Sequence, residues 1–224
     1  MKLKLSAVLL ISCLSMSAAT ITGDLDISGS VRIGADFADF VPLGGVDGTF
    51  NVEPTSTGSF TSLVVPITNN DGTILDLNAG IAPVGVVFSL PNFLTFVADP
   101  TLSFELTFID PGAFAPCGGP SIACSVNQFN LVQNGNSVVA NFNVRGNVLQ
   151  NGVQMAAFVG SFSQSFAGQT IAGILGTVQR QGFIDSAFEG NFTTSAIPEP
   201  GGMSLFAIGS ALTGVLALVR RKRS

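Results

Sequence analysis

The amino-acid sequence predicts an all-β protein: an antiparallel β-sandwich, with a jelly-roll topology as one option, and one short helix. Apolar and polar residues alternate along most of residues 20–196, which is the pattern of strands with one buried face. Asp-Gly and Asn-Gly pairs interrupt this alternation and suit tight turns, because these residues tolerate positive φ angles. One stretch alone stands out by repeating its apolar residues with a helical period.

Residues 1–19 are typical of a secretory signal peptide. Two lysines give a positively charged start, an apolar segment follows from Leu5 to Ile11, and small residues precede a cleavage site between Ala19 and Thr20. Signal peptidase is the expected partner for this cleavage. An alternative is the lipoprotein motif Leu-Ile-Ser-Cys, in which Cys13 would carry the lipid. Both alternatives predict export.

The strands of the domain at residues 20–196 are predicted from their alternation. In one of the clearest, Leu102, Phe104 and Leu106 alternate with polar side chains. Similar segments, separated by turn residues, continue through the domain and predict the sandwich. The expected strands are Ile21–Ile33, Phe60–Pro66, Thr73–Leu77, Val84–Leu90, Phe93–Val97, Leu102–Ile109, Phe129–Val132, Val138–Val148, Met155–Phe166 and Phe183–Thr193.

The helical stretch lies between Gly168 and Gln181. Its apolar residues occur at positions i, i+3, i+4 and i+7, which places them on one face of a short amphipathic helix. We expect this helix to cover an open end of the sheets. The residues are Ile171, Ile174, Leu175 and Val178.

Cys117 and Cys124 enclose a loop rich in glycine and proline. In an exported protein, two cysteines this close are expected to form a disulfide. The alternatives are two free thiols or, with less support, a metal site, because the chain has no histidine to complete one.

The charge of the domain at residues 20–196 is strongly negative. It holds thirteen acidic residues against Arg32, Arg145 and Arg180, a net charge of −10. Such a surface repels the phosphate backbone, so nucleic acid is excluded as a partner.

Few residues offer enzymatic chemistry. With no histidine, tyrosine or tryptophan, the chain cannot form a Ser-His-Asp or Cys-His arrangement. Asp99, Glu105 and Asp110 are candidates for a glycosidase pair, although we expect them to be solvated surface groups. The segment Asp24–Gly29 imitates the start of a calcium loop, but a strand explains it better because its later ligand positions are missing. No enzyme activity, catalytic residue, metal site or cofactor is predicted.

The C-terminus combines three features in order. A stiff acidic tripeptide, Pro198-Glu199-Pro200, is followed by an apolar run at residues 203–219 and then by four basic residues. An uncharged helix of this length spans about 25 Å, slightly less than the hydrocarbon core of a bilayer. Basic flanking residues favour the cytoplasmic side, so the domain is expected outside. The basic residues are Arg220, Arg221, Lys222 and Arg223.

These features resemble a PEP-CTERM sorting domain, a signature also labelled the ice-binding protein C-terminal domain. The resemblance covers residues 197–224. It implies that exosortase is a partner, that anchoring in the inner membrane is transient, and that the chain is processed near Pro198-Glu199-Pro200 in bacteria that make exopolysaccharide. The alternative is a permanent tail anchor with an incidental proline-rich linker.

The sequence therefore favours a non-enzymatic, exported protein of the cell surface or extracellular matrix, associated with exopolysaccharide or biofilm. A surface module that binds glycan, calcium or ice is the second hypothesis. A secreted hydrolase with an Asp/Glu pair is the third, and it requires two carboxyl groups about 5–9 Å apart.

Overall fold

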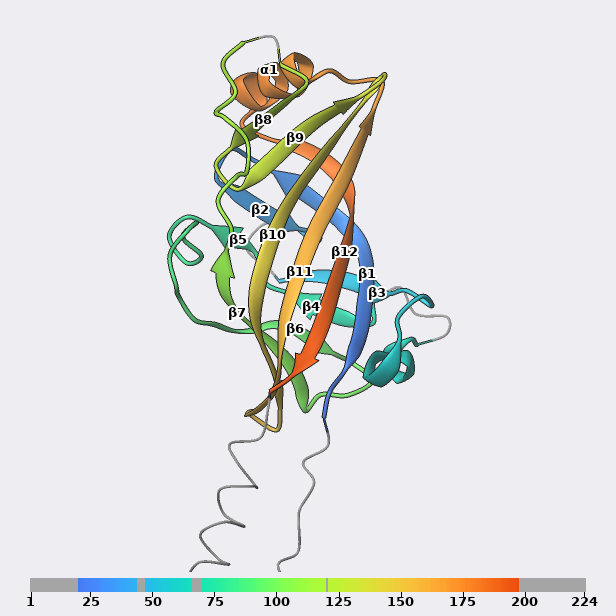
Figure 1. Ribbon diagram of the computed structural model, residues 1–224. Helices are drawn as coiled ribbons and strands as arrows, with labels where there is room; N and C mark the ends of the chain where they lie inside the picture. Colours follow the sequence, from blue (N-terminus) through green and yellow to red (C-terminus); the bar gives the residue numbers. More distant parts are fainter. Residues whose placement is uncertain (1–19, 44–46, 66–69, 120, 198–224) are drawn as a thin grey trace, which may run out of the picture.

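The computed structural model describes residues 20–43, 47–65, 70–119 and 121–197, which form an antiparallel β structure with one α-helix (Figure 1). This confirms the all-β class and the single short helix. The strands are β1 (Gly23–Ile33), β2 (Phe37–Phe40), β3 (Gly48–Val52), β4 (Gly72–Ile74), β5 (Leu77–Asn78), β6 (Leu90–Phe96), β7 (Leu102–Ile109), β8 (Ala123–Val126), β9 (Phe129–Asn134), β10 (Ser137–Gln150), β11 (Val153–Ala167) and β12 (Ile184–Ala196), with the 3-10 helix η1 (Gly58–Leu63) and α1 (Ile171–Gln181).

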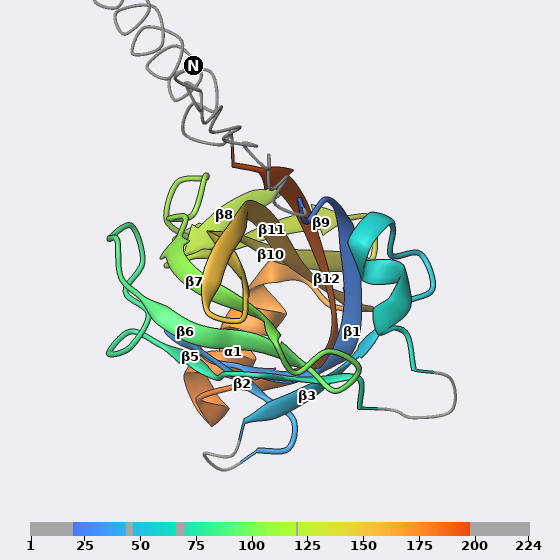
Figure 2. The ribbon, with the colours of Figure 1, turned by 90° about the horizontal axis from the view of Figure 1, so that it is seen from below.

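Eight of these strands close into a barrel, so the prediction of a β-sandwich is wrong. Around the barrel the order is β10, β11, β12, β1, β3, β4, β6 and β7, and β7 pairs again with β10. Figure 2, seen from below, shows these strands as a ring around the interior. A sandwich and a barrel share the same alternation of buried and exposed residues, so the pattern alone could not separate them.

Closure depends on the two longest strands. β10 pairs with β11 over its whole length and with β7 along its other edge, and the register with β7 shifts between Arg145 and Gly146. Such irregularities bend a strand and increase its twist. At the shift the backbones approach so closely that a Cβ at Gly146 would lie 1.9 Å from the carbonyl oxygen of Glu105. Glycine at this position therefore permits the curvature that joins β10 to β7.

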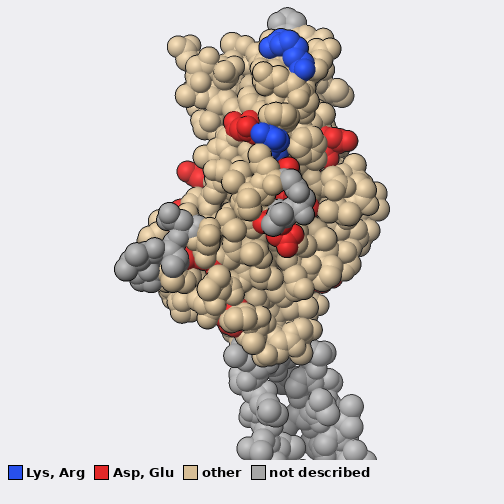
Figure 3. All heavy atoms as spheres, turned by 180° about the vertical axis from the view of Figure 1, so that it is seen from behind, with Lys and Arg blue, Asp and Glu red and all other residues tan. Residues whose placement is uncertain are grey.

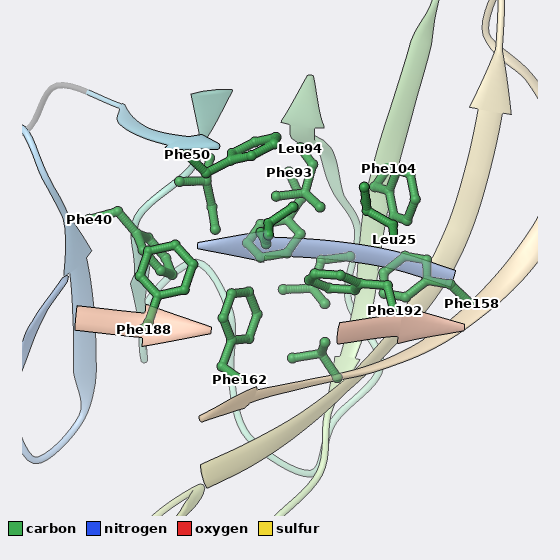
Figure 4. Close-up of a cluster of buried hydrophobic side chains, with 14 of the residues drawn as sticks. Leu25, Phe40, Phe50, Phe93, Leu94, Phe104, Phe158, Phe162, Phe188 and Phe192 are labelled. Carbon is green, nitrogen blue, oxygen red and sulfur yellow. The ribbon is translucent and has the colours of Figure 1, made fainter. Parts of the chain in front are cut away.

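The interior of the barrel is filled by phenylalanine rings (Figure 4). Phe162 lies among them, stacked on Phe142 with ring centroids 4.9 Å apart and in edge contact with Phe192 at 5.4 Å. Each buried ring contributes about 2–3 kcal/mol through burial, and each favourable ring pair adds about 0.5–1.5 kcal/mol. Burial in the core thus accounts for thirteen of the nineteen phenylalanines of the chain.

A second, smaller core lies where α1 covers one end of the barrel, as expected for this helix. Thr170 caps its N-terminus by accepting a hydrogen bond from the amide of Gly173, and Gly182 ends it with a φ of 84°. Ile171 and Ile174 are buried against residues of β8 to β11. Those residues are Cys124, Leu131, Val138, Ala140 and Phe166.

Most predicted strands are confirmed, two are wrong, and the predicted strand Thr73–Leu77 is divided between β4 and β5. The segment predicted as the strand Phe60–Pro66 instead begins within the 3-10 helix η1. Phe60 and Leu63 are both buried, and their spacing of three residues places them on one face of a 3-10 helix. In the segment predicted as the strand Val84–Leu90, Val84 forms a single bridge with Ile109 and the residues that follow are irregular. Only Leu90 belongs to a strand, as the first residue of β6. The strands β2, β3 and β8 were not predicted.

Both ends of the described chain leave the barrel at the same end, opposite α1 (Figure 1). The first residue of β1, Gly23, pairs with Thr194 near the end of β12. The predicted cleavage residue Thr20 lies in the short segment before β1, whereas Ala19, Cys13, the sorting motif and the basic tail lie outside the described residues. Among the described residues, no helix is both long and apolar enough to cross a membrane.

Candidate functional site

The polar outer face of β10, β11, β12 and β1 is the candidate site. These four strands are neighbours around the barrel, and their register aligns outward side chains in rows across them. One row runs Asn143, Ser161, Asn191, Asp26, and the next runs Asn141, Ser163, Glu189, Ser28. We refer to these eight residues as the polar face.

Hydrogen bonds from neighbouring side chains hold Asp24, Asp26 and Glu53 in place. The Asn191 amide donates to Asp26 Oδ1, and the neighbouring Ser28 hydroxyl donates to Glu53 Oε1. One row further along, Thr193 Oγ1 donates to Asp24 Oδ1 at 2.8 Å. Side chains held in this way lose little freedom when a ligand binds, which lowers the cost of binding.

Two adjoining hollows lie on the polar face, with volumes of about 380 and 490 Å³. Ser161 and Asn191 line both of them, so the two hollows adjoin. Each volume is in the range of about 300–1,000 Å³ that is typical of small-ligand sites. Each hollow is therefore large enough for a small polar unit.

The two hollows differ in charge. The first contains Asp110 and Arg145, which form an ion pair in which Arg145 Nη2 donates to both carboxylate oxygens of Asp110 at 2.8 and 3.0 Å. The second is lined by the carboxylates of Asp26, Glu53 and Glu189 with no basic side chain among its lining residues. Carboxylates, amides and hydroxyls suit a ligand that presents hydroxyl groups, whereas an anionic ligand would be repelled from the second hollow.

The carboxylates that were candidates for catalysis lie before β7 (Asp99), within it (Glu105) and directly after it (Asp110), each with its own partners. Thr101 Oγ1 donates to Asp99 at 2.6 Å, and this bond, followed by one from Gln150, holds the pKa of Asp99 below its usual value. Ser89 Oγ donates to Glu105 at 2.6 Å and, together with Asn147, lowers the pKa of Glu105. Asp110 belongs to the ion pair with Arg145.

This arrangement does not favour a glycosidase pair. Glu105 and Asp110 are five residues apart along an extended strand, a separation of about 16 Å, whereas the two carboxyl groups of a glycosidase lie about 5–9.5 Å apart. A general acid also needs a raised pKa, and the pKa values of Asp99 and Glu105 are lowered. The three residues are hydrogen-bonded surface groups.

The segment Asp24–Gly29 lies within β1, as expected from its apolar residues, and does not form a calcium loop. Its two aspartates face the neighbouring strand β12, where they accept hydrogen bonds from Thr193 and Asn191. Among the residues that the structure describes, no group of three or more acidic or cysteine side chains is placed to hold a metal ion.

The predicted disulfide between Cys117 and Cys124 is present, with Cα atoms 4.9 Å apart. It closes the loop between β7 and β8 at the end of the barrel covered by α1. The cysteines therefore have a structural role that is separate from the polar face.

Sequence reasoning predicted all four of these strands and missed the site that they form together. β1 and β12 are about 160 residues apart along the chain and become neighbours only through the barrel, as the pairing of Asp26 with Asn191 shows. The available signal was the repeated Asn, Ser and Thr on the outward positions of β10, β11 and β12.

Comparisons of this chain with models of protein families, with curated proteins and with solved structures found no match.

Proposed function

We propose that this protein is a non-enzymatic, exported component of the cell surface or extracellular matrix, sorted by exosortase and associated with exopolysaccharide. The observation that carries the proposal is the common exit of both chain ends from one end of the barrel. Once signal peptidase has cleaved before Thr20, the sorting tail after Ile197 would hold that end at the inner membrane. The rest of the barrel then faces outward.

The proposed sorting tail is the C-terminal segment at residues 197–224. Residues 203–219 would cross the membrane transiently while the basic residues from Arg220 to Arg223 remain in the cytoplasm. Exosortase would act near Pro198-Glu199-Pro200 and release or transfer the barrel.

Intact mass spectrometry of the protein from its host, with and without exosortase, tests this proposal. We expect a mature chain that starts at Thr20 and ends near Pro198, seen only when exosortase is present. A variant with Pro198→Ala and Pro200→Ala should retain its tail in both strains. A wild-type chain that keeps residues 203–224 in both strains would show a permanent anchor and contradict the sorting proposal.

For the domain itself, we propose that the polar face binds a neutral, hydroxyl-rich polysaccharide. The support is the pair of adjoining hollows, whose lining includes amides, hydroxyls and carboxylates. The chain has no tyrosine or tryptophan to stack on sugar rings. Binding would therefore depend on hydrogen bonds, and single sites would be weak.

Affinity electrophoresis in gels containing the host's neutral exopolysaccharide tests this assignment. Ser161 and Asn191 line both hollows, so replacing both with alanine should abolish the retardation of the protein by the polymer. The matched control replaces Thr73 and Thr95 with alanine. Like Ser161 and Asn191, they are polar residues paired across neighbouring strands, here β4 and β6 on the other side of the barrel, and their hydroxyls lie 2.6 Å apart. Equal loss of binding in both variants would contradict a site on the polar face.

A further inference from the structure

The end of the barrel opposite the two chain ends differs from the rest of the molecule in charge. We call the disulfide loop Cys117–Cys124, together with β8, β9 and α1, the distal pole (Figure 1). Residues 111–184 contain no acidic residue, and their only charged residues are Arg145 and Arg180. All thirteen acidic residues of the domain lie at positions 24–110 and 185–189. Figure 3 shows the same separation, with red side chains over the middle and lower parts of this view.

The distal pole also has a projecting apolar side chain beside a groove. Ile122 is 80% exposed, the highest value among the exposed large hydrophobic residues of the described chain. The groove has a volume of about 690 Å³ and runs between the disulfide loop and α1. Small residues make up much of its lining and leave room for an inserted side chain: Gly118, Gly119, Ala172 and Gly176.

Both walls of this groove are fixed to the same residue, Gln133. The backbone N–H of Gln133 donates to the carbonyl oxygen of Ile122 at 2.8 Å, and the disulfide closes the loop that carries Ile122. On the other wall, its side-chain Oε1 accepts from the amide of Ile171 at 3.2 Å, and its Nε2 donates to the carbonyl oxygen of Gln169. The projection and the groove are therefore held in a fixed relation, which reduces the entropy lost on association.

We propose that the distal pole binds the distal pole of a second copy of this chain, with Ile122 of each copy inserted into the groove of the other. A two-fold dimer requires a surface that complements itself, and a projection next to a matching hollow satisfies this requirement. The charge distribution favours the same partner. Two acidic bodies repel each other side by side, whereas the distal poles meet with only Arg180 as a charged residue.

Sedimentation equilibrium of the full chain in detergent micelles tests this inference. A contact with a Kd of about 10 µM is mostly dimeric at about 100 µM protein. We expect Ile122→Glu to weaken the dimer about tenfold or more, because a charge would be buried without a partner. The matched control is Val153→Glu, at a residue that is 61% exposed near the turn between β10 and β11, at the opposite end of the barrel. All variants keep the tail, so association through the tail affects them equally.

A charge-complementation experiment separates docking from loss of folding. The variants Ile122→Lys and Ala172→Glu should each be monomeric alone, since each places a charge in the apolar contact. Mixed together, they should form a heterodimer in which the introduced lysine of one copy meets the introduced glutamate of the other. A wild-type chain that stays monomeric at about 100 µM, an Ile122→Glu variant as dimeric as Val153→Glu, or a mixture that remains monomeric would each overturn the proposal.

Discussion

Glu105 shows how hydrogen bonds favour the ionised form of a carboxylate on this surface. Its side chain accepts hydrogen bonds from Ser89 Oγ and Asn147 Nδ2, and these bonds favour the charged form and lower its pKa from the ordinary value of 4.5. Asp99 is held in the same way by Thr101 and Gln150. Groups of this kind contribute to stability as anions and are unsuited to donate protons.

We predict that the protein loses part of its stability in acid because Glu105 becomes protonated. Its pKa is lower in the folded than in the unfolded chain, so its contribution to stability is present above the unfolded value and is lost as the pH falls through the folded pKa. The Glu105→Gln variant should therefore lose less stability than the wild type between about pH 7 and pH 3. Urea unfolding midpoints at both pH values measure this difference. Equal losses in the two proteins would show that Glu105 has no role in acid sensitivity.

The curvature of β10 depends on the absence of a side chain at Gly146. A Cβ there would lie 1.9 Å from the Glu105 carbonyl oxygen and 2.6 Å from the Phe158 ring. Neither the backbone of β7 nor the packed ring can move away without disturbing the barrel, so this position is sensitive to the smallest substitution.

Gly146→Ala should accordingly destabilise the protein by about 1–3 kcal/mol, the usual cost of an added methyl group in a packed interior. Gly119→Ala is the control, because a Cβ at Gly119 meets no atom within 4 Å, and its effect should remain within about 0.5 kcal/mol. Denaturant unfolding monitored by far-UV circular dichroism gives both values. A Gly146→Ala variant as stable as the control would mean that the strands separate more easily than the structure indicates.

Long elements were predictable from the sequence and short ones were not. β10, β11 and β12 have 14, 15 and 13 residues, and their alternation persists long enough to identify them. β2 and β8 have four residues each, too few for a period to be distinguished from chance. The helix α1 was also predictable, because its apolar residues repeat at 3.6-residue spacing.

Closure and site assembly were beyond the reach of the sequence for a different reason. Alternation shows which residues face inward but not which strand is the neighbour, and pairs such as Asp26 with Asn191 depend on contacts far apart along the chain. The disulfide between Cys117 and Cys124 could be predicted because its partners are close in sequence. The polar face and the groove at the distal pole could not.

For the molecule as a whole, the separation of charge predicts how self-association responds to salt. The acidic bodies repel each other over distances that salt screens, while the proposed contact at the distal pole is apolar and nearly uncharged. Raising the ionic strength from about 0.01 M to 0.15 M should therefore strengthen the dimer. Sedimentation of the wild type and of Ile122→Glu in both buffers measures this. A dimer that salt weakens would indicate a contact between opposite charges.

The common exit of both chain ends also restricts where pairing can take place. If the proposed sorting tail holds the copies in the inner membrane, they would stand parallel, with all their distal poles directed away from that membrane, and neighbouring copies could not face each other. On that route, pairing would begin only once exosortase has freed the barrels from their tails. The same barrel would thus be monomeric while it is anchored and able to pair after its release.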